Sequence, residues 1–132
     1  MAIQHRKEDY FERLIAEAFE AFNRLVGNSN PPALQNLENR LDELLREPGL
    51  TLAQLETAPL PDLASLLQQH PVNADVLELI ADTFQFKANW QQNTALQEKA
   101  TWIYEYLLAN KQGNSISYTL LMKLNKAKKD KG

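Results

Sequence analysis

The fold class is decided by residues 74–110, which read ADVLELIADTFQFKANWQQNTALQEKATWIYEYLLAN. Apolar residues recur there every three or four positions, which is the period of an α-helix, and the polar stretch at residues 91–94 separates two such segments. The first segment is apolar on two sides, as is typical of a helix packed between neighbours. Two helices joined by so short a connection are expected to form an antiparallel hairpin.

The helical period continues on both sides of this pair, and no alternating run of strand length interrupts it. We therefore expect an all-α fold of five to seven helices in a single domain spanning residues 1–132. A flexible N-terminus is expected over about residues 1–6, and a lysine-rich C-terminal tail over about residues 125–132. The first helix is predicted from about residue 7. Later helices are predicted to begin at Asn30-Pro31, Thr51, Asn73 and Ser115, and earlier ones to end at Gly27, Pro48-Gly49 and Pro71.

The composition of the chain is that of a globular protein and argues against several classes of function. The 132 residues are 44% hydrophobic and 23% charged, which is ordinary for a globular domain. No cysteine is present, which excludes disulfides and thiolate nucleophiles. Residues 1–122 carry 16 acidic and 9 basic side chains, an acidic balance that disfavours nucleic acid as a partner. No signal peptide or membrane span is apparent, so we expect a cytoplasmic protein with no membrane partner.

Within residues 82–108 the helical pair resembles a tetratricopeptide unit. Ala88 and Ala100 stand twelve positions apart, as that family's two small residues do, and Tyr104 follows where the family places an aromatic residue. The whole chain also resembles a group of small bacterial helical proteins of unassigned function that are related to tetratricopeptide repeats. That likeness rests on Asp9-Tyr10 in the first helix, a leucine-rich middle and this helix pair.

The tetratricopeptide resemblance implies a binding surface, because that family holds its ligands along the first helix of the unit. The matching partner-binding residues here are Asp82, Gln85, Asn89, Gln92 and Asn93. Steps of three, four and three residues independently place the first four on one helix face. Amide side chains can both donate to and accept from an extended peptide backbone. The same face could equally be polar surface in contact with water.

Aromatic residues on the same two helices form an alternative interface patch, namely Phe86, Trp90, Trp102 and Tyr106. Aromatic residues at helical spacing also fill protein cores, and only exposure would mark them as an interface.

Catalytic chemistry has little support in the sequence. His5 and His70 are the only histidines, and both are expected to be ordinary surface residues. The chain lacks the zinc-protease, nucleophile-elbow and phosphate-loop motifs. We therefore expect no catalytic residues, no cofactor and no metal.

The leading hypothesis is a non-enzymatic, helical-repeat-like interaction or assembly module. Its partner would be a protein, a peptide or a second copy of the chain in a homodimer. Two alternatives stay open, namely a small enzyme with an unrecognised site and a nucleic-acid accessory protein that uses the basic C-terminal tail.

Overall fold

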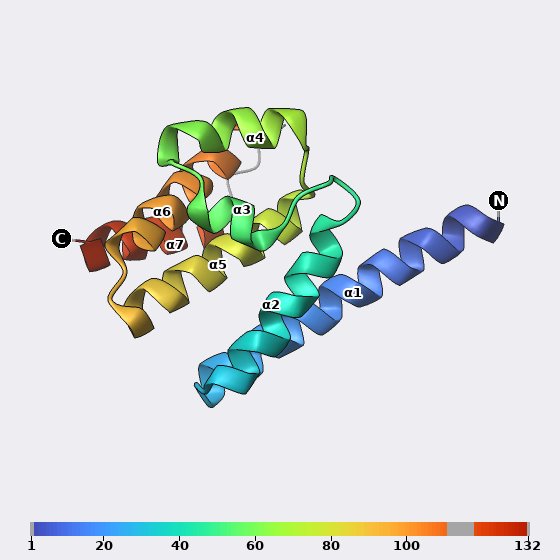
Figure 1. The fold of residues 1–132 in the computed structure, drawn as a ribbon, viewed down its shortest axis with the longest axis horizontal. Coiled ribbons are helices and arrows are strands. Elements are labelled where there is room, and N and C mark those ends of the chain that lie inside the picture. The colour runs from blue at the N-terminus through green and yellow to red at the C-terminus, as the bar shows by residue number, and fades with distance from the viewer. Residues whose placement is uncertain (1, 111–117, 132) are drawn as a thin grey trace. The chain divides into compact units, whose positions relative to one another are not determined.

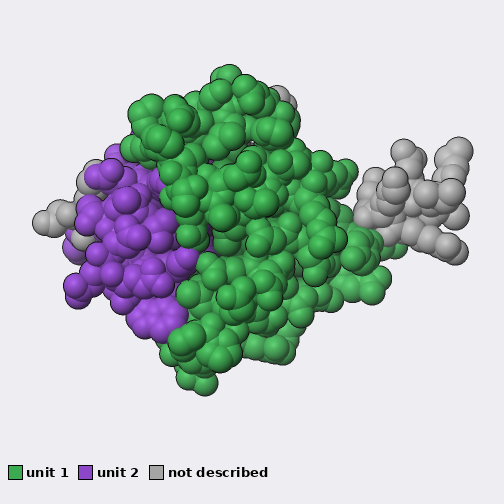
Figure 2. All heavy atoms as spheres, in the orientation of Figure 1, with its two compact units in different colours: residues 1–72 green, residues 73–132 purple. Residues whose placement is uncertain are grey.

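The computed structural model describes residues 2–110 and 118–131, with side chains over 9–110 and 119–129. These residues form seven α-helices, one 3-10 helix and no strand, which confirms the all-α prediction for the described chain (Figure 1). The chain divides into two compact units, residues 1–72 and residues 73–132, which Figure 2 colours separately. Each unit is described by itself, and the expectation of a single domain stays a prediction.

Unit 1 contains one long helix, one of medium length and several short elements. They are α1 (Ala2–Gly27), α2 (Pro31–Leu45), α3 (Leu52–Thr57), the 3-10 helix η1 (Leu60–Asp62) and α4 (Leu63–Gln69). Helix α1 begins earlier than the predicted start near residue 7. Residues 2–6 contain neither glycine nor proline, so nothing in the sequence stops the helix there.

Helices α1 and α2 pack against each other through small and aliphatic side chains. Ala18 and Leu25 of α1 and Leu37 and Leu41 of α2 are fully buried. Asn30 caps α2 as predicted, because its side-chain oxygen accepts a 2.8 Å hydrogen bond from the Ala33 amide. The predicted start of α2 is therefore correct.

The turn between α2 and α3 follows the stop and start signals of the sequence. Gly49 has a φ of +86°, a left-handed conformation that glycine adopts without strain. Thr51, the predicted start of this helix, forms a capping box with Gln54, in which each side chain accepts a hydrogen bond from the other residue's backbone amide. Asp42 of α2 accepts a 2.7 Å hydrogen bond from the Leu52 amide, which ties the start of α3 to α2.

Unit 2 consists of α5 (Ala74–Gln91), α6 (Thr94–Ala109) and α7 (Tyr118–Lys131). Gln92 and Asn93 alone connect α5 to α6, and the two helices pack against each other. Gln92 adopts a left-handed conformation with a φ of 54°, which ends α5. The buried side chains of the pair include Leu77, Ile80, Phe84, Ala88, Ala100, Ile103 and Tyr104.

Helix α7 includes most of the lysine-rich segment that we expected as a C-terminal tail over about residues 125–132. It continues to Lys131, and Ala127 is completely buried. Gln97 Nε2 donates a 2.9 Å hydrogen bond to the Ala127 carbonyl, so α6 holds the backbone of α7. The reason is that Ala127 continues the stripe of Leu120 and Leu124, which keeps the basic segment amphipathic. The predicted cap at Ser115 lies outside the described residues.

Candidate functional site

The polar face predicted on α5 is divided between internal and exposed residues. Asp82 is largely buried, with 10% of its side chain exposed. Gln85 is buried and donates a 3.4 Å hydrogen bond to Asn89 Oδ1. Asn89, Gln92 and Asn93 are exposed, although the Asn93 side chain caps α6 by accepting from the Leu96 amide at 3.2 Å. Only part of the face is therefore open to solvent, and its role in binding stays a prediction.

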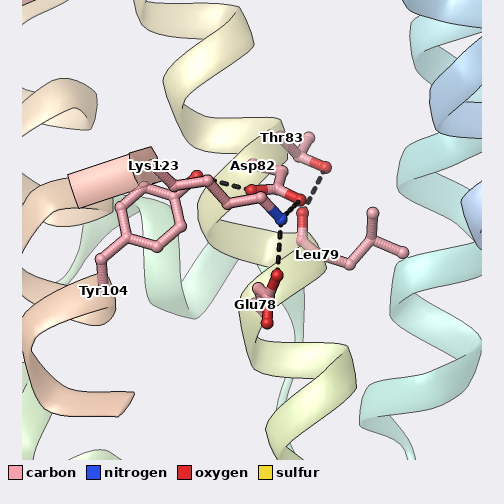
Figure 3. A network of polar contacts seen from close by, with 6 residues as sticks. All are labelled: Glu78, Leu79, Asp82, Thr83, Tyr104 and Lys123. Atoms are coloured by element: carbon pink, nitrogen blue, oxygen red, sulfur yellow. Dashed lines mark hydrogen bonds and ion pairs between the residues drawn. The ribbon is translucent and has the colours of Figure 1, made fainter. Parts of the chain in front are cut away.

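A cluster of polar side chains joins all three helices of unit 2 (Figure 3). Tyr104 Oη on α6 donates a 2.6 Å hydrogen bond to Asp82 Oδ1 on α5. Lys123 Nζ on α7 lies 2.9 Å from Asp82 Oδ2 and 2.5 Å from Glu78 Oε2. Glu78 and Asp82 stand one turn apart on α5, so both carboxylates face the same ammonium group. We call these four residues the acidic clamp, because they fasten α7 to α5 and α6.

Burial and pairing shift the ionisation of three members of the acidic clamp. Burial raises the pKa of Asp82, although the hydrogen bonds from Tyr104 and Lys123 oppose this shift. Burial and the neighbouring Asp82 carboxylate raise the pKa of Tyr104. Burial acts to lower the pKa of Lys123, but the hydrogen bonds and charges of Glu78 and Asp82 outweigh it and raise that pKa. Tyr104 and Lys123 therefore hold their protons tightly in the folded chain.

These shifts argue against a catalytic role for Lys123. A nucleophilic lysine needs a lowered pKa, so that the neutral amine is available at neutral pH. Lys123 shows the opposite shift, and two carboxylates already hold its ammonium group. The geometry of the acidic clamp therefore fits a structural fastening of α7.

The predicted aromatic patch forms two pairs, one on each helix. Phe86 and Trp90 of α5 meet edge to face, with ring centroids 5.9 Å apart. Trp102 and Tyr106 of α6 are stacked, with centroids 5.1 Å apart. Trp90 is 40% exposed, whereas the other three side chains are half-buried. Trp90 is therefore the member of the patch that is most open to a partner.

A hollow in unit 1 was missed by our reading of the sequence. It lies between the N-terminal half of α1 and the end of α2, and its volume is about 410 Å³. Its lining residues are Tyr10, Phe11, Leu14, Glu43, Leu44, Arg46 and Glu47. We call this hollow the α1–α2 groove.

The α1–α2 groove combines an apolar floor with a charged rim. Leu44 is 2% exposed and Tyr10 is 55% exposed. The Arg13 guanidinium lies 6.0 Å from the centroid of the Tyr10 ring, near the limit of a cation–π contact. Two glutamates and Arg46 line the groove, so its charged residues sum to a net charge of −1.

The two helices that line this groove differ in length. Helix α1 has 26 residues and α2 has 15, so at 1.5 Å per residue α1 is about 16 Å longer. The sequence did contain a signal for this groove, namely the apolar residues Phe11 and Leu14 in the first half of α1. The two glutamates of the lining, Glu43 and Glu47, were a second signal.

Metal-binding and histidine chemistry find no support among the described side chains. No group of three or more histidine or acidic residues there could hold a metal ion. His70 is half-buried, and its Nδ1 lies 2.7 Å from the Pro48 carbonyl oxygen. The His70 ring therefore helps to close the turn after α2. His5 lies outside the described side chains.

Two further findings bear on the class of protein. Within residues 2–110 and 118–131, no helix has the length and apolar character that crossing a membrane requires. Comparison of the chain with protein-family models, with curated proteins and with solved structures returned no match. The predicted cytoplasmic location stays a prediction.

Proposed function

We propose that this chain is a non-enzymatic protein-interaction module and that its partner docks in the α1–α2 groove. The observation that carries the proposal is the groove itself, whose lining combines an exposed tyrosine, a buried leucine and three charged residues. Protein interfaces combine an aromatic anchor and an apolar pocket with a polar border in this way. Tyr10 would be the anchor and Leu44 the floor.

The shape of the groove favours a helical partner. It runs beside an exposed part of α1, where a second helix could lay an apolar stripe into the space that α2 leaves open. Its volume of about 410 Å³ accommodates one or two large side chains. The glutamates of the rim favour basic residues next to that stripe.

The tetratricopeptide-like organisation of residues 74–110 belongs to the same proposal. Its support is that α5 and α6 pack together and that Ala88 and Ala100 are both buried. On this model the exposed Asn89, Gln92 and Trp90 form a second surface at the end of α5.

Site-specific photocrosslinking in living cells tests the proposed groove. A benzophenone amino acid would replace Tyr10 in one strain and the exposed Glu20 of α1 in a control strain. We expect a discrete protein adduct from position 10, none from position 20, and loss of the adduct when Glu43→Lys is added. Equal labelling from both positions, or none from either, would show that no protein occupies the groove.

A further inference from the structure

The solvent-exposed face of α7 presents one methionine and two lysines that take no part in the acidic clamp. Met122, Lys126 and Lys129 follow one another in steps of four and three residues, so they share one face of the helix. All three are exposed, and Met122 at 72% is the most exposed large apolar side chain among those described. The buried side of α7, with Leu124 and Ala127, faces the rest of unit 2.

This basic face complements the α1–α2 groove in chemical character. Methionine is flexible and polarisable, and it fits irregular apolar pockets well. Lys126 and Lys129 are about 5 Å apart along their helix face. Glu43 lies in the last turn of α2 and Glu47 in the turn that follows it, and both line the groove. Met122 would therefore fit the apolar part of the groove. The two lysines that follow it would lie near the two glutamates of the rim.

The net charges of the two units also favour a contact between the α1–α2 groove and α7. Residues 1–72 contain eleven acidic and six basic side chains, whereas residues 73–132 contain six acidic and eight basic ones. Unit 1 therefore carries a net charge of −5 and unit 2 a net charge of +2. Opposite charges on the two units favour contact between unit 1 of one molecule and unit 2 of another.

We infer that the α1–α2 groove of one copy binds helix α7 of a second copy. Met122 enters the pocket over Leu44, and Lys126 and Lys129 pair with Glu43 and Glu47. The inference rests on the proposed function, because it names the partner of that same groove. The two contacting surfaces differ, so the contact is heterologous and forms a closed ring or an open chain of copies.

Sedimentation velocity of the purified full chain over a wide concentration range tests this inference. The wild type should associate more as concentration rises, and added salt should weaken the association, because the rim contacts are charged. Met122→Ser should weaken association by about tenfold or more, since a central apolar anchor is lost. A wild type that stays monomeric at every concentration overturns the inference.

A charge exchange gives the sharper test. Lys126→Glu/Lys129→Glu and Glu43→Lys/Glu47→Lys should each weaken self-association by at least about tenfold, because like charges then meet. An equimolar mixture of the two double variants should associate again, since the acidic α7 of one fits the basic rim of the other. Glu20→Lys, the same change at an exposed site of α1 away from the groove, should leave association at the wild-type level. All five positions are exposed, so each variant should keep its helical circular dichroism.

The outcomes separate this inference from the proposed function. If the mixture fails to associate while each variant alone is monomeric, α7 is not the occupant and the inference fails. A monomeric purified protein that still gives an adduct with a different protein from position 10 leaves the proposed function standing. Loss of the adduct together with a monomeric protein removes both.

Discussion

Tyr104 Oη lies 2.6 Å from Asp82 Oδ1, so the hydroxyl group of α6 donates to the carboxylate of α5. The tetratricopeptide resemblance implies that Asp82 lies on a ligand-binding face. In the structure both oxygens of this carboxylate already have partners within unit 2, Tyr104 and Lys123. The residue is thus engaged in holding three helices together, and any partner must compete with those contacts.

Tyr104→Phe should destabilise the chain without changing its fold. Tyr104 is 2% exposed, and the substitution removes a hydrogen bond to a buried carboxylate while keeping the ring. A hydrogen bond to a charged group contributes about 1.5–3 kcal/mol, and we expect a loss of that size in urea unfolding. Tyr106→Phe is the matched control, because Tyr106 is half-buried and stacks on Trp102. It should change the free energy of unfolding by less than about 0.5 kcal/mol.

The acidic clamp should make the fold sensitive to alkaline pH. The pKa values of Lys123 and Tyr104 are raised above their ordinary values of 10.5 and 10.0. A group whose pKa is raised by folding stabilises the fold fully below its unfolded pKa, and that stabilisation is lost as pH rises through the folded pKa. The free energy of unfolding should therefore fall as pH rises above about 10 through these two groups.

Urea midpoints measured on either side of this pH would check the sign. Lys123→Met removes one contributing group, so its stability should fall less steeply with pH than that of the wild type. Lys126→Met removes an exposed lysine from the same helix and should keep the wild-type slope. Parallel slopes for the wild type and Lys123→Met would contradict the assignment.

Ala100→Leu tests the close approach of α5 and α6. Ala100 is completely buried, so three extra carbon atoms must displace neighbouring side chains or the helix itself. Overpacking of this kind costs about 1–3 kcal/mol in unfolding free energy. Ala95→Leu, the same change at an exposed position of α6, should be close to neutral. If the two variants have the same midpoint in denaturant, the helices do not meet closely at Ala100.

Gln92→Gly should stabilise the chain, because Gln92 has a φ of 54° and glycine adopts that conformation without the steric cost of a Cβ atom. We expect a gain of up to about 1 kcal/mol, measured by thermal and urea unfolding. The comparison is Gln91→Gly at the last residue of α5, which has right-handed helical geometry, and this variant should lose up to about 0.5–1 kcal/mol. A loss of stability in Gln92→Gly would mean that its side chain makes a contact worth more than the backbone strain.

Local signals explain which parts of the structure the sequence could predict. Asn30, Thr51 and Asn73 cap their helices as expected, because each bonds to an amide within three residues. The acidic clamp could not be foreseen, since Lys123 lies 41 residues from Asp82 along the chain. The helical period of the sequence shows on which face of a helix a polar side chain lies. It does not show which helix from elsewhere in the sequence packs against that face.

The α1–α2 groove was missed for a related reason. A stripe of Tyr10, Phe11 and Leu14 looks the same in sequence whether or not a second helix covers it. The groove is lined by residues of both α1 and the end of α2, so it can be recognised only once the two helices are known to pack together.

The last prediction compares the two candidate surfaces in one experiment. The partner recovered by crosslinking at position 10 would be titrated into the wild type, Tyr10→Ser and Asn89→Ala by calorimetry. Tyr10 is exposed, so Tyr10→Ser should change stability by less than about 0.5 kcal/mol. Asn89→Ala also removes the acceptor of the Gln85 hydrogen bond, so its unfolding is measured beside its binding. Tyr10→Ser should weaken binding by about 2 kcal/mol or more, because an aromatic anchor at the centre of an interface is lost. Asn89→Ala should bind as the wild type does if the groove holds the partner. The reverse result, a loss at Asn89 with Tyr10→Ser unaffected, would move the binding site to the end of α5, as the tetratricopeptide resemblance first implied.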